Sequence, residues 1–165
     1  MYNDLASVGQ AIRRRREALG LSQARLAHLS DLALSTVSGL ENGTLADLGY
    51  NRVAQILNVI GLVPSTPVQR VLGRQNGLFM AAKTASVSYK DELDVPTLIT
   101  ALATGEVPRK FIAHVAHLLD EAPLPLIVTA VEEAAEKSHT PPKRVWKNIS
   151  MLAKQFDLSR RKALA

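Results

Sequence analysis

Apolar residues recur three and four positions apart along most of the chain, which is the spacing of one face of an α-helix. Between residues 5 and 62 this pattern predicts four or five short helices, with Gly20 and Gly61 as stops. The clearest apolar stripe in this region consists of Val53, Ile56, Leu57 and Ile60. A segment with two prolines, Pro64 and Pro67, then interrupts the helical pattern. We therefore expect one domain over 1–63, a linker over 64–77 and a second domain over 78–165.

The second domain is also predicted to be helical. Asp94 is a natural N-cap for a stripe that ends at Gly105, and Pro108 stands where the next helix begins. A further helix is expected over 124–137, and Thr140 followed by Pro141 is expected to cap the last one. Residues 78–89 include β-branched and aromatic residues that favour a strand, but we predict a helix there. The predicted fold class is therefore all-α.

Composition narrows the class of protein. The chain has 165 residues, of which 47% are hydrophobic and only 4% aromatic, so its core must consist mostly of aliphatic side chains. It contains no cysteine, which excludes disulfides, thiolate metal sites and cysteine nucleophiles. The apolar runs are far shorter than the roughly 18 residues of a membrane span, and the N-terminus resembles no signal peptide. We expect a soluble, cytoplasmic protein.

Charge is distributed unevenly around a formal net value of +5. Residues 91–136 hold nine acids and two bases, a local net charge of −7, whereas the chain from Thr140 onward holds seven bases and one acid, a local net charge of +6. The two regions are able to attract each other within the fold or across a dimer, or the basic end is able to lie along phosphates. The sequence leaves these alternatives open.

Residues 22–43 carry the pattern that indicates a function. Ser22 is able to cap a helix, Leu26, Ala27 and Leu29 face inward on it, and a turn near Asp31 leads to a second helix that contains Val37 and Leu40. The small side chain of Ala27 allows the second helix to cross closely. This is the layout of a helix-turn-helix, in which the first helix crosses the DNA backbone and the second lies in the major groove.

The region from about Leu5 to Leu62 resembles the helix-turn-helix family of phage Cro and repressor proteins. The matching positions are Ile12, Arg16, Gly20-Leu21-Ser22-Gln23, Leu26-Ala27, Ser35-Thr36-Val37-Ser38 and Leu40-Glu41-Asn42-Gly43. The resemblance implies a five-helix N-terminal domain that binds double-stranded DNA as a homodimer. It also implies a structural ion pair between Arg16 and Glu41, so neither residue is expected to be catalytic.

The residues expected to meet DNA are mostly small. Leu34, Ser35, Thr36, Ser38 and Gly39 should face the bases, whereas Gln23 and Asn42 should position the protein on phosphates. The recognition helix has no Arg, Asn or Gln for a two-point base contact in these base-facing positions, so DNA shape is expected to supply much of the specificity. Gly39 lowers helix propensity, which favours a close approach of the backbone to another surface there.

The sequence leaves two starts open for the recognition helix, because Ala33 stands at the usual capping position and has no side-chain acceptor. Asp31 is an alternative cap. Its use would shift the start of the helix and rotate the face that meets DNA.

Other candidate sites have simpler interpretations. His114 and His117 have the spacing of two metal ligands, but no third ligand motif accompanies them, so we expect exposed or capping histidines and no metal. The cluster of Glu132, Glu133 and Glu136 is expected to be a solvated face, with Glu133 able to pair with a lysine four residues later. Trp146 is expected in a core or an interface. We therefore predict no enzyme activity and no cofactor.

The predicted function is steric repression of a promoter. The segment Asp47-Leu48-Gly49-Tyr50, which runs into residues 53–62, resembles the end of the helix-turn-helix domain in antitoxins of bacterial toxin–antitoxin pairs. This resemblance implies an autoregulating antitoxin whose C-terminal helices bind and neutralise a toxin. Two alternatives stay open. One is a general phage or bacterial repressor that dimerises or senses a ligand through its second domain, and the other is a protein-interaction module with the helix-turn-helix as scaffold.

Overall fold

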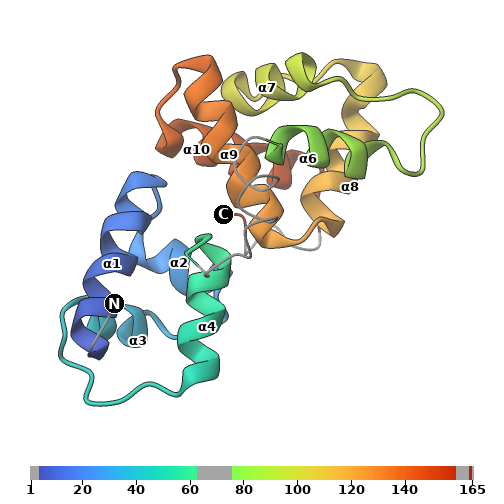
Figure 1. Cartoon of the computed structure of the whole chain (residues 1–165). Coiled ribbons are helices and arrows are strands. Elements are labelled where there is room, and N and C mark those ends of the chain that lie inside the picture. Colours follow the sequence, from blue (N-terminus) through green and yellow to red (C-terminus); the bar gives the residue numbers. More distant parts are fainter. Residues whose placement is uncertain (1–3, 63–75, 159–163, 165) are drawn as a thin grey trace. The chain divides into compact units, whose positions relative to one another are not determined.

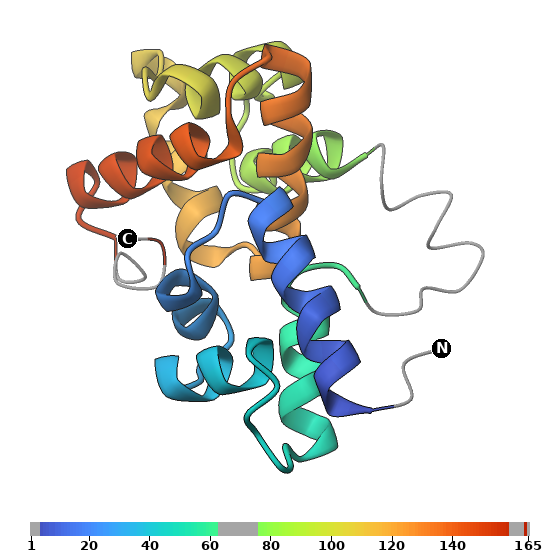
Figure 2. The ribbon, with the colours of Figure 1, turned by 90° about the vertical axis from the view of Figure 1, so that its left-hand side faces the viewer.

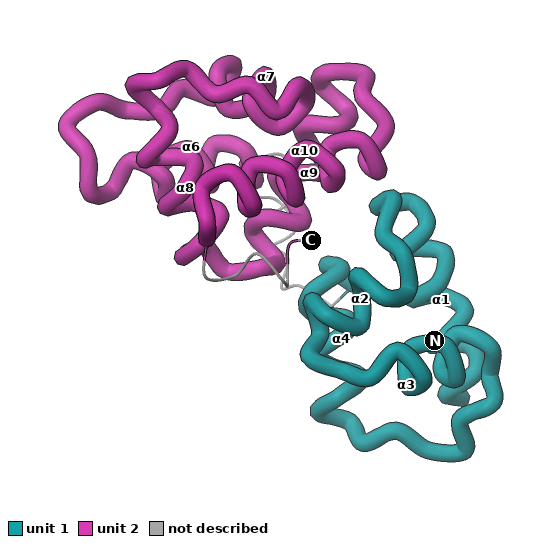
Figure 3. The backbone as a smooth tube through the Cα atoms, turned by 180° about the vertical axis from the view of Figure 1, so that it is seen from behind, with its two compact units in different colours: residues 1–64 teal, residues 65–165 magenta. Residues whose placement is uncertain are grey.

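The computed structural model describes residues 4–62, 76–158 and 164, and the ordered elements among them are helices without a β-strand. The all-α prediction is therefore confirmed. The chain divides into two compact units, residues 1–64 and residues 65–165 (Figure 3). The expected linker over 64–77 lies outside the described residues except for Asn76 and Gly77. None of the described helices has the length and apolar character that a membrane crossing requires.

The described residues of unit 1 form four helices (Figure 1). The fifth helix that the family resemblance implies is not among the described residues. The four described helices are α1 (Leu5–Ala18), α2 (Gln23–Leu29), α3 (Leu34–Glu41) and α4 (Tyr50–Val59). Capping fixes two of the starts, because the side chain of Asp4 accepts a hydrogen bond from the Ser7 backbone N–H, and that of Ser22 accepts one from the Arg25 backbone N–H. The core holds one aliphatic residue or more from every helix, including Ile12, Leu26, Val37, Leu40 and Ile56.

Helices α1 and α3 pack unusually closely at Gly9. A Cβ atom added to Gly9 would collide with the Leu40 carbonyl oxygen and lie 2.8 Å from the Leu40 carbonyl carbon. Only glycine fits this contact, because the obstructing atoms belong to the backbone and no rotamer change moves them. Gly9 thus sets the distance between α1 and the helix expected to meet DNA.

Unit 2 consists of α6 (Gly77–Ser86), α7 (Val95–Thr104), the 3₁₀ turn η1 (Arg109–Phe111), α8 (Ile112–Glu121), α9 (Leu124–Ser138) and α10 (Pro142–Gln155). The helix predicted over 78–89 is confirmed by α6. Helix α9 is central and packs against α6, α7 and α10, and Figure 2 shows α10 turning back from the end of α9. Trp146 on α10 is 1% exposed and is therefore a core residue of this unit.

Two predicted helix starts in unit 2 are wrong. Thr140 does not cap the last helix; Pro141 precedes it, and the helix begins at Pro142. The reason is that Pro142 disfavours the α conformation for the residue before it, so Pro141 is extended with ψ of 134°. Pro108 likewise precedes a 3₁₀ turn, and α8 begins only at Ile112, after Phe111 has buried its ring.

Glu133 is the largest departure from the expectations for unit 2. We expected a solvated carboxylate, but Glu133 is 5% exposed. Its Oε1 accepts a hydrogen bond from the Gly77 backbone N–H at 2.7 Å, and its Oε2 accepts one from the Leu78 backbone N–H at 3.2 Å. These donors stand at the start of α6, where the helix has no internal acceptors for them and its dipole favours a negative charge. Glu133 therefore joins α9 to α6 by acting as a cap from another helix.

We expect Glu133→Ala to lower the free energy of unfolding of unit 2 by about 1 to 3 kcal/mol, because it leaves two buried N–H donors without an acceptor. Urea unfolding followed by Trp146 fluorescence measures this, since Trp146 is the single tryptophan and lies in unit 2. Glu136→Ala, at an exposed position on the same helix, is the matched control and should stay within about 0.5 kcal/mol of the parent protein. Equal effects of the two variants would contradict the capping role.

Candidate nucleic-acid interface

The turn between α2 and α3 places the start of α3 at Leu34. The alternative in which Asp31 caps the helix is wrong, because Asp31 adopts a left-handed conformation with φ of 50° and its N–H donates to the His28 carbonyl oxygen at 3.2 Å. Asp tolerates this conformation better than most residues. Ala33 is the N-cap and supplies no side-chain hydrogen bond. The exposed face of α3 therefore keeps the register that the sequence predicts.

Helix α3 separates its buried and exposed residues cleanly. Val37, Leu40 and Glu41 are buried, whereas Leu34 is 50% exposed and Ser35 and Asn42 are exposed. At 100° per residue, Leu34, Ser38, Asn42, Ser35 and Gly39 share one arc of about 140°. Thr36 lies roughly 60° beyond the end of that arc, and it is half-buried, as Ser38 and Gly39 are within the arc. The structure thus groups five of the predicted contact residues on one face and leaves Thr36 at its edge.

Gly39 serves the protein itself. A Cβ atom at Gly39 would lie 3.1 Å from Leu45 Cγ and 3.4 Å from Thr44 Oγ1, so the close surface is the loop after α3. The Gly39 carbonyl oxygen accepts hydrogen bonds from the N–H groups of Thr44 and Leu45, at 2.9 and 3.3 Å. The sequence predicts that another surface approaches the backbone closely at Gly39. The structure shows such an approach, and the surface is the protein's own loop at Thr44 and Leu45.

A buried polar cluster holds α1, α2 and α3 together. Arg16 donates from Nε to Glu41 Oε1 at 2.7 Å and from Nη2 to Glu41 Oε2 at 2.8 Å, and its Nη1 donates to the Leu21 carbonyl oxygen at 2.9 Å. The two side chains of the implied ion pair are thus in contact through a two-point geometry. The hydrogen bond to Glu41 raises the pKa of Arg16 above its ordinary value, against the opposing effect of burial. The cluster therefore keeps its charge while its members are buried.

Gln23 and Asn42 stand at opposite ends of the two helices. Gln23 Nε2 donates to Glu41 Oε2 at 2.8 Å, so the carboxylate that binds Arg16 also orients the first residue of α2. Asn42 follows the end of α3, and its Nδ2 donates to Ser38 Oγ at 3.3 Å. The Ser38 oxygen accepts this bond, which leaves its hydroxyl hydrogen to donate elsewhere.

Arg25 is the cation nearest in sequence to the start of α2 and was not among the predicted contacts. Its residue is half-buried, and burial lowers its pKa below the ordinary value. Its backbone N–H closes the cap on Ser22 at 3.1 Å. No signal in the sequence distinguishes this arginine from the others in the unit.

The expectation of exposed or capping histidines is wrong for His114, which lies inside α8 and faces the interior of unit 2. His114 is buried, its Nε2 lies 2.7 Å from the Asp91 carbonyl oxygen, and its ring stacks on Tyr89 with 4.1 Å between centroids. His117 contacts the same tyrosine edge-on at 6.3 Å between centroids. In the part of the chain that the structure describes, no three His, Cys, Asp or Glu side chains are grouped to hold a metal ion.

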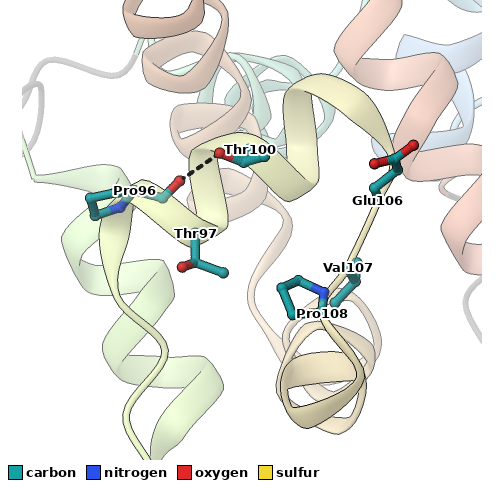
Figure 4. Close-up of a pocket in the computed structure, with 6 residues that line it drawn as sticks. All are labelled: Pro96, Thr97, Thr100, Glu106, Val107 and Pro108. Carbon is teal, nitrogen blue, oxygen red and sulfur yellow. Dashed lines mark hydrogen bonds between the residues drawn. The ribbon is translucent and has the colours of Figure 1, made fainter.

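A shallow hollow of about 480 Å³ lies beside α7 (Figure 4). Its lining residues are Pro96, Thr97, Thr100, Glu106, Val107 and Pro108. The Thr100 hydroxyl already donates to the Pro96 carbonyl oxygen at 3.0 Å, and only Glu106 of the six carries an ionisable side chain. These six residues therefore include no acid–base pair.

Residues 12–66, about a third of the chain, match the family model described as Helix-turn-helix. This match confirms the resemblance to the Cro and repressor family, and it covers α2, α3 and α4 together with the second half of α1. Comparison with curated proteins and with solved structures gives no match. Unit 1 therefore contains a helix-turn-helix domain of a type found in DNA-binding regulators, and unit 2 is characterised by its own structure alone.

Proposed function

We propose, from the helix-turn-helix match of residues 12–66, that this protein is a sequence-specific repressor that binds double-stranded DNA as a homodimer. In this proposal α3 lies in the major groove, and the two copies of α3 meet half-sites about one helical turn, roughly 34 Å, apart. Repression follows from occupancy of the promoter and requires no chemical step. Unit 2 then serves to dimerise the chain or to bind a partner.

The observation that carries this proposal is the exposed face of α3. Ser35 and Ser38 present hydroxyl groups that are able to donate to or accept from either base, and Leu34 presents an apolar contact for a thymine methyl group. Thr36 and Gly39 border this face, and Gln23 and Asn42 position the domain on phosphates. Because none of the residues assigned to the bases has a side chain that is able to make a two-point contact with guanine or adenine, DNA shape contributes to the choice of operator.

Fluorescence anisotropy with the DNA upstream of the protein's own gene, and with a scrambled duplex, tests the proposal. We expect the former to bind at least about 10³-fold more tightly, within the range of specific over non-specific binding. Ser35→Ala/Ser38→Ala should remove most of that preference, because the homodimer loses four hydroxyl groups and each lost hydrogen bond is worth about 1 kcal/mol. Affinity for the scrambled duplex should be unchanged.

The matched control is Gln55→Ala/Asn58→Ala, which removes two exposed polar side chains from α4 and should leave both affinities unchanged. Equal binding of the two duplexes by the parent protein would overturn sequence-specific repression of that promoter.

The finer proposal is an autoregulating antitoxin that also neutralises a cognate toxin. Residues 47–50 support it by their resemblance to antitoxin domains, and exposed carboxylates of unit 2, such as Glu121 and Glu136, supply an acidic surface for a partner. Co-purification of the adjacent gene product with the tagged chain, together with relief of the growth inhibition that this product causes alone, tests it. An adjacent product that does neither leaves a general repressor with a dimerisation or ligand domain.

A further inference from the structure

Unit 1 has little charge with which to bind a polyanion. Residues 4–62 contain six arginines and five carboxylates, a net charge of +1. Arg13 and Arg16 are already paired with Glu17 and Glu41, at 3.0 and 2.7 Å. Affinity for duplex DNA rests largely on the phosphates that a protein neutralises and the counterions it thereby releases. A duplex bound by unit 1 alone would therefore be held through few such contacts.

Unit 2 carries a row of exposed cations on α10, which we call the basic face of α10. Its members are Lys143, Arg144, Lys147 and Lys154. At 100° per residue these four side chains share an arc of about 100°, and the residues that anchor α10 in unit 2 lie on the opposite arc. Val145, Ile149 and Leu152 are buried there, and Asn148 Nδ2 donates to the Ala103 carbonyl oxygen at 2.7 Å. The basic face is therefore held rigidly outward.

The cations of this face are available for a partner. Within the described residues none of the four forms an ion pair, although residues 91–136 of the same unit are rich in carboxylates. The sequence left open an attraction between the acidic and basic regions. Among the described residues, these four cations form no ion pair with the carboxylates of the acidic region. Along the helix axis the row from Lys143 to Lys154 spans about 17 Å, which is long enough to contact more than one phosphate of a DNA backbone.

We infer that the basic face of α10 binds the phosphate backbone of the same duplex whose bases α3 contacts. This inference rests on the proposed function, since it assigns a second surface of the chain to that partner. DNA is favoured over an acidic protein because a duplex held by unit 1 is at high local concentration for unit 2 of the same chain. The contact is independent of base sequence, so it raises affinity for every duplex and leaves discrimination to α3.

The experiment replaces all four cations by glutamine in the full chain, Lys143→Gln/Arg144→Gln/Lys147→Gln/Lys154→Gln. The matched control has the same net charge and neutralises four exposed cations elsewhere in unit 2, Lys90→Gln/Arg109→Gln/Lys110→Gln/Lys137→Gln. Trp146 emission and circular dichroism establish that both variants are folded. Anisotropy is measured with the upstream and scrambled duplexes at several salt concentrations from about 50 to about 200 mM.

We expect the α10 variant to lose about tenfold or more in affinity for both duplexes. Its slope of log affinity against log salt should fall by about 2 to 4 for each α10 of the homodimer that contacts the duplex, because each lost phosphate contact changes the slope by about 0.9. The ratio of the two affinities should not change, in contrast to Ser35→Ala/Ser38→Ala. The control variant should keep the parent slope.

Equal losses in the α10 and control variants would show an effect of net charge and overturn the inference, as would an unchanged slope in the α10 variant. If the parent protein binds both duplexes alike while the α10 variant still loses its slope, the proposed specificity fails and the inference stands. A parent protein that binds neither duplex would overturn both.

Discussion

Gly9→Ala is expected to unfold unit 1 at much lower urea concentrations than the parent protein. The added methyl group meets the Leu40 carbonyl group, part of the α3 backbone, so α1 and α3 must move apart for it to fit. Interiors are close-packed, and forced separation loses contacts along the whole interface. We expect a loss at or above the upper end of the usual cost of overpacking, about 3 kcal/mol or more. Specific DNA binding should be lost with it.

The two units provide separate readouts for this variant. Circular dichroism reports helices in both units, whereas fluorescence of Trp146 reports unit 2. We therefore expect Gly9→Ala to shift the unfolding curve measured by circular dichroism and to change the curve measured by fluorescence little. Gly49→Ala is the control, because a Cβ atom at Gly49 meets nothing within 4 Å and the residue has φ of −52°. It should change stability by less than about 1 kcal/mol, because the entropic gain of replacing a glycine is offset by the poorer fit of alanine at the N-cap of α4. A Gly9→Ala protein as stable as this control would contradict the close packing of α1 and α3.

The sequence allowed the helices to be predicted well because their signals are local. Apolar spacing identified α6 despite its β-branched neighbours, and Asp94 and Gly105 marked both ends of α7, where the Asp94 side chain accepts from the Thr97 N–H at 2.8 Å. That hydrogen bond lowers the pKa of Asp94 below its ordinary value. The errors at Thr140 and Pro108 were also local, because consecutive prolines and a 3₁₀ turn shift a helix start by a few residues.

Features that depend on distant contacts were not predictable in this way. Glu133 lies 56 residues from Gly77 in sequence, and only the packing of α9 on α6 reveals that its carboxylate is buried. The role of Gly39 likewise depends on the packing of the loop at Thr44 and Leu45 against α3. In the candidate site, the exposed face of α3 was predictable from a resemblance and from helical geometry, whereas the hydrogen bond between Gln23 and Glu41 required the structure.

Arg16→Met is expected to lower the free energy of unfolding of unit 1 by about 3 to 5 kcal/mol, the usual cost of leaving one member of a buried ion pair without its partner. The Glu41 side chain is fully buried and would retain a hydrogen bond only from Gln23. Circular dichroism during urea unfolding measures the loss. Because Glu41 ends α3 and Gln23 begins α2, we expect the variant to lose specific DNA binding at temperatures where its unit 2 is still folded.

Two further variants separate the cost of an unpaired charge from other effects. Arg13→Met breaks the Arg13–Glu17 pair, whose side chains are 53% and 52% exposed, and should cost less than about 1 kcal/mol because water screens that pair. Arg16→Met/Glu41→Leu removes both buried charges and should recover most of the stability lost in Arg16→Met. A double variant as unstable as the single one would mean that the hydrogen bonds of Arg16 to Leu21 and of Gln23 to Glu41, rather than the unpaired carboxylate, dominate the stability of this cluster.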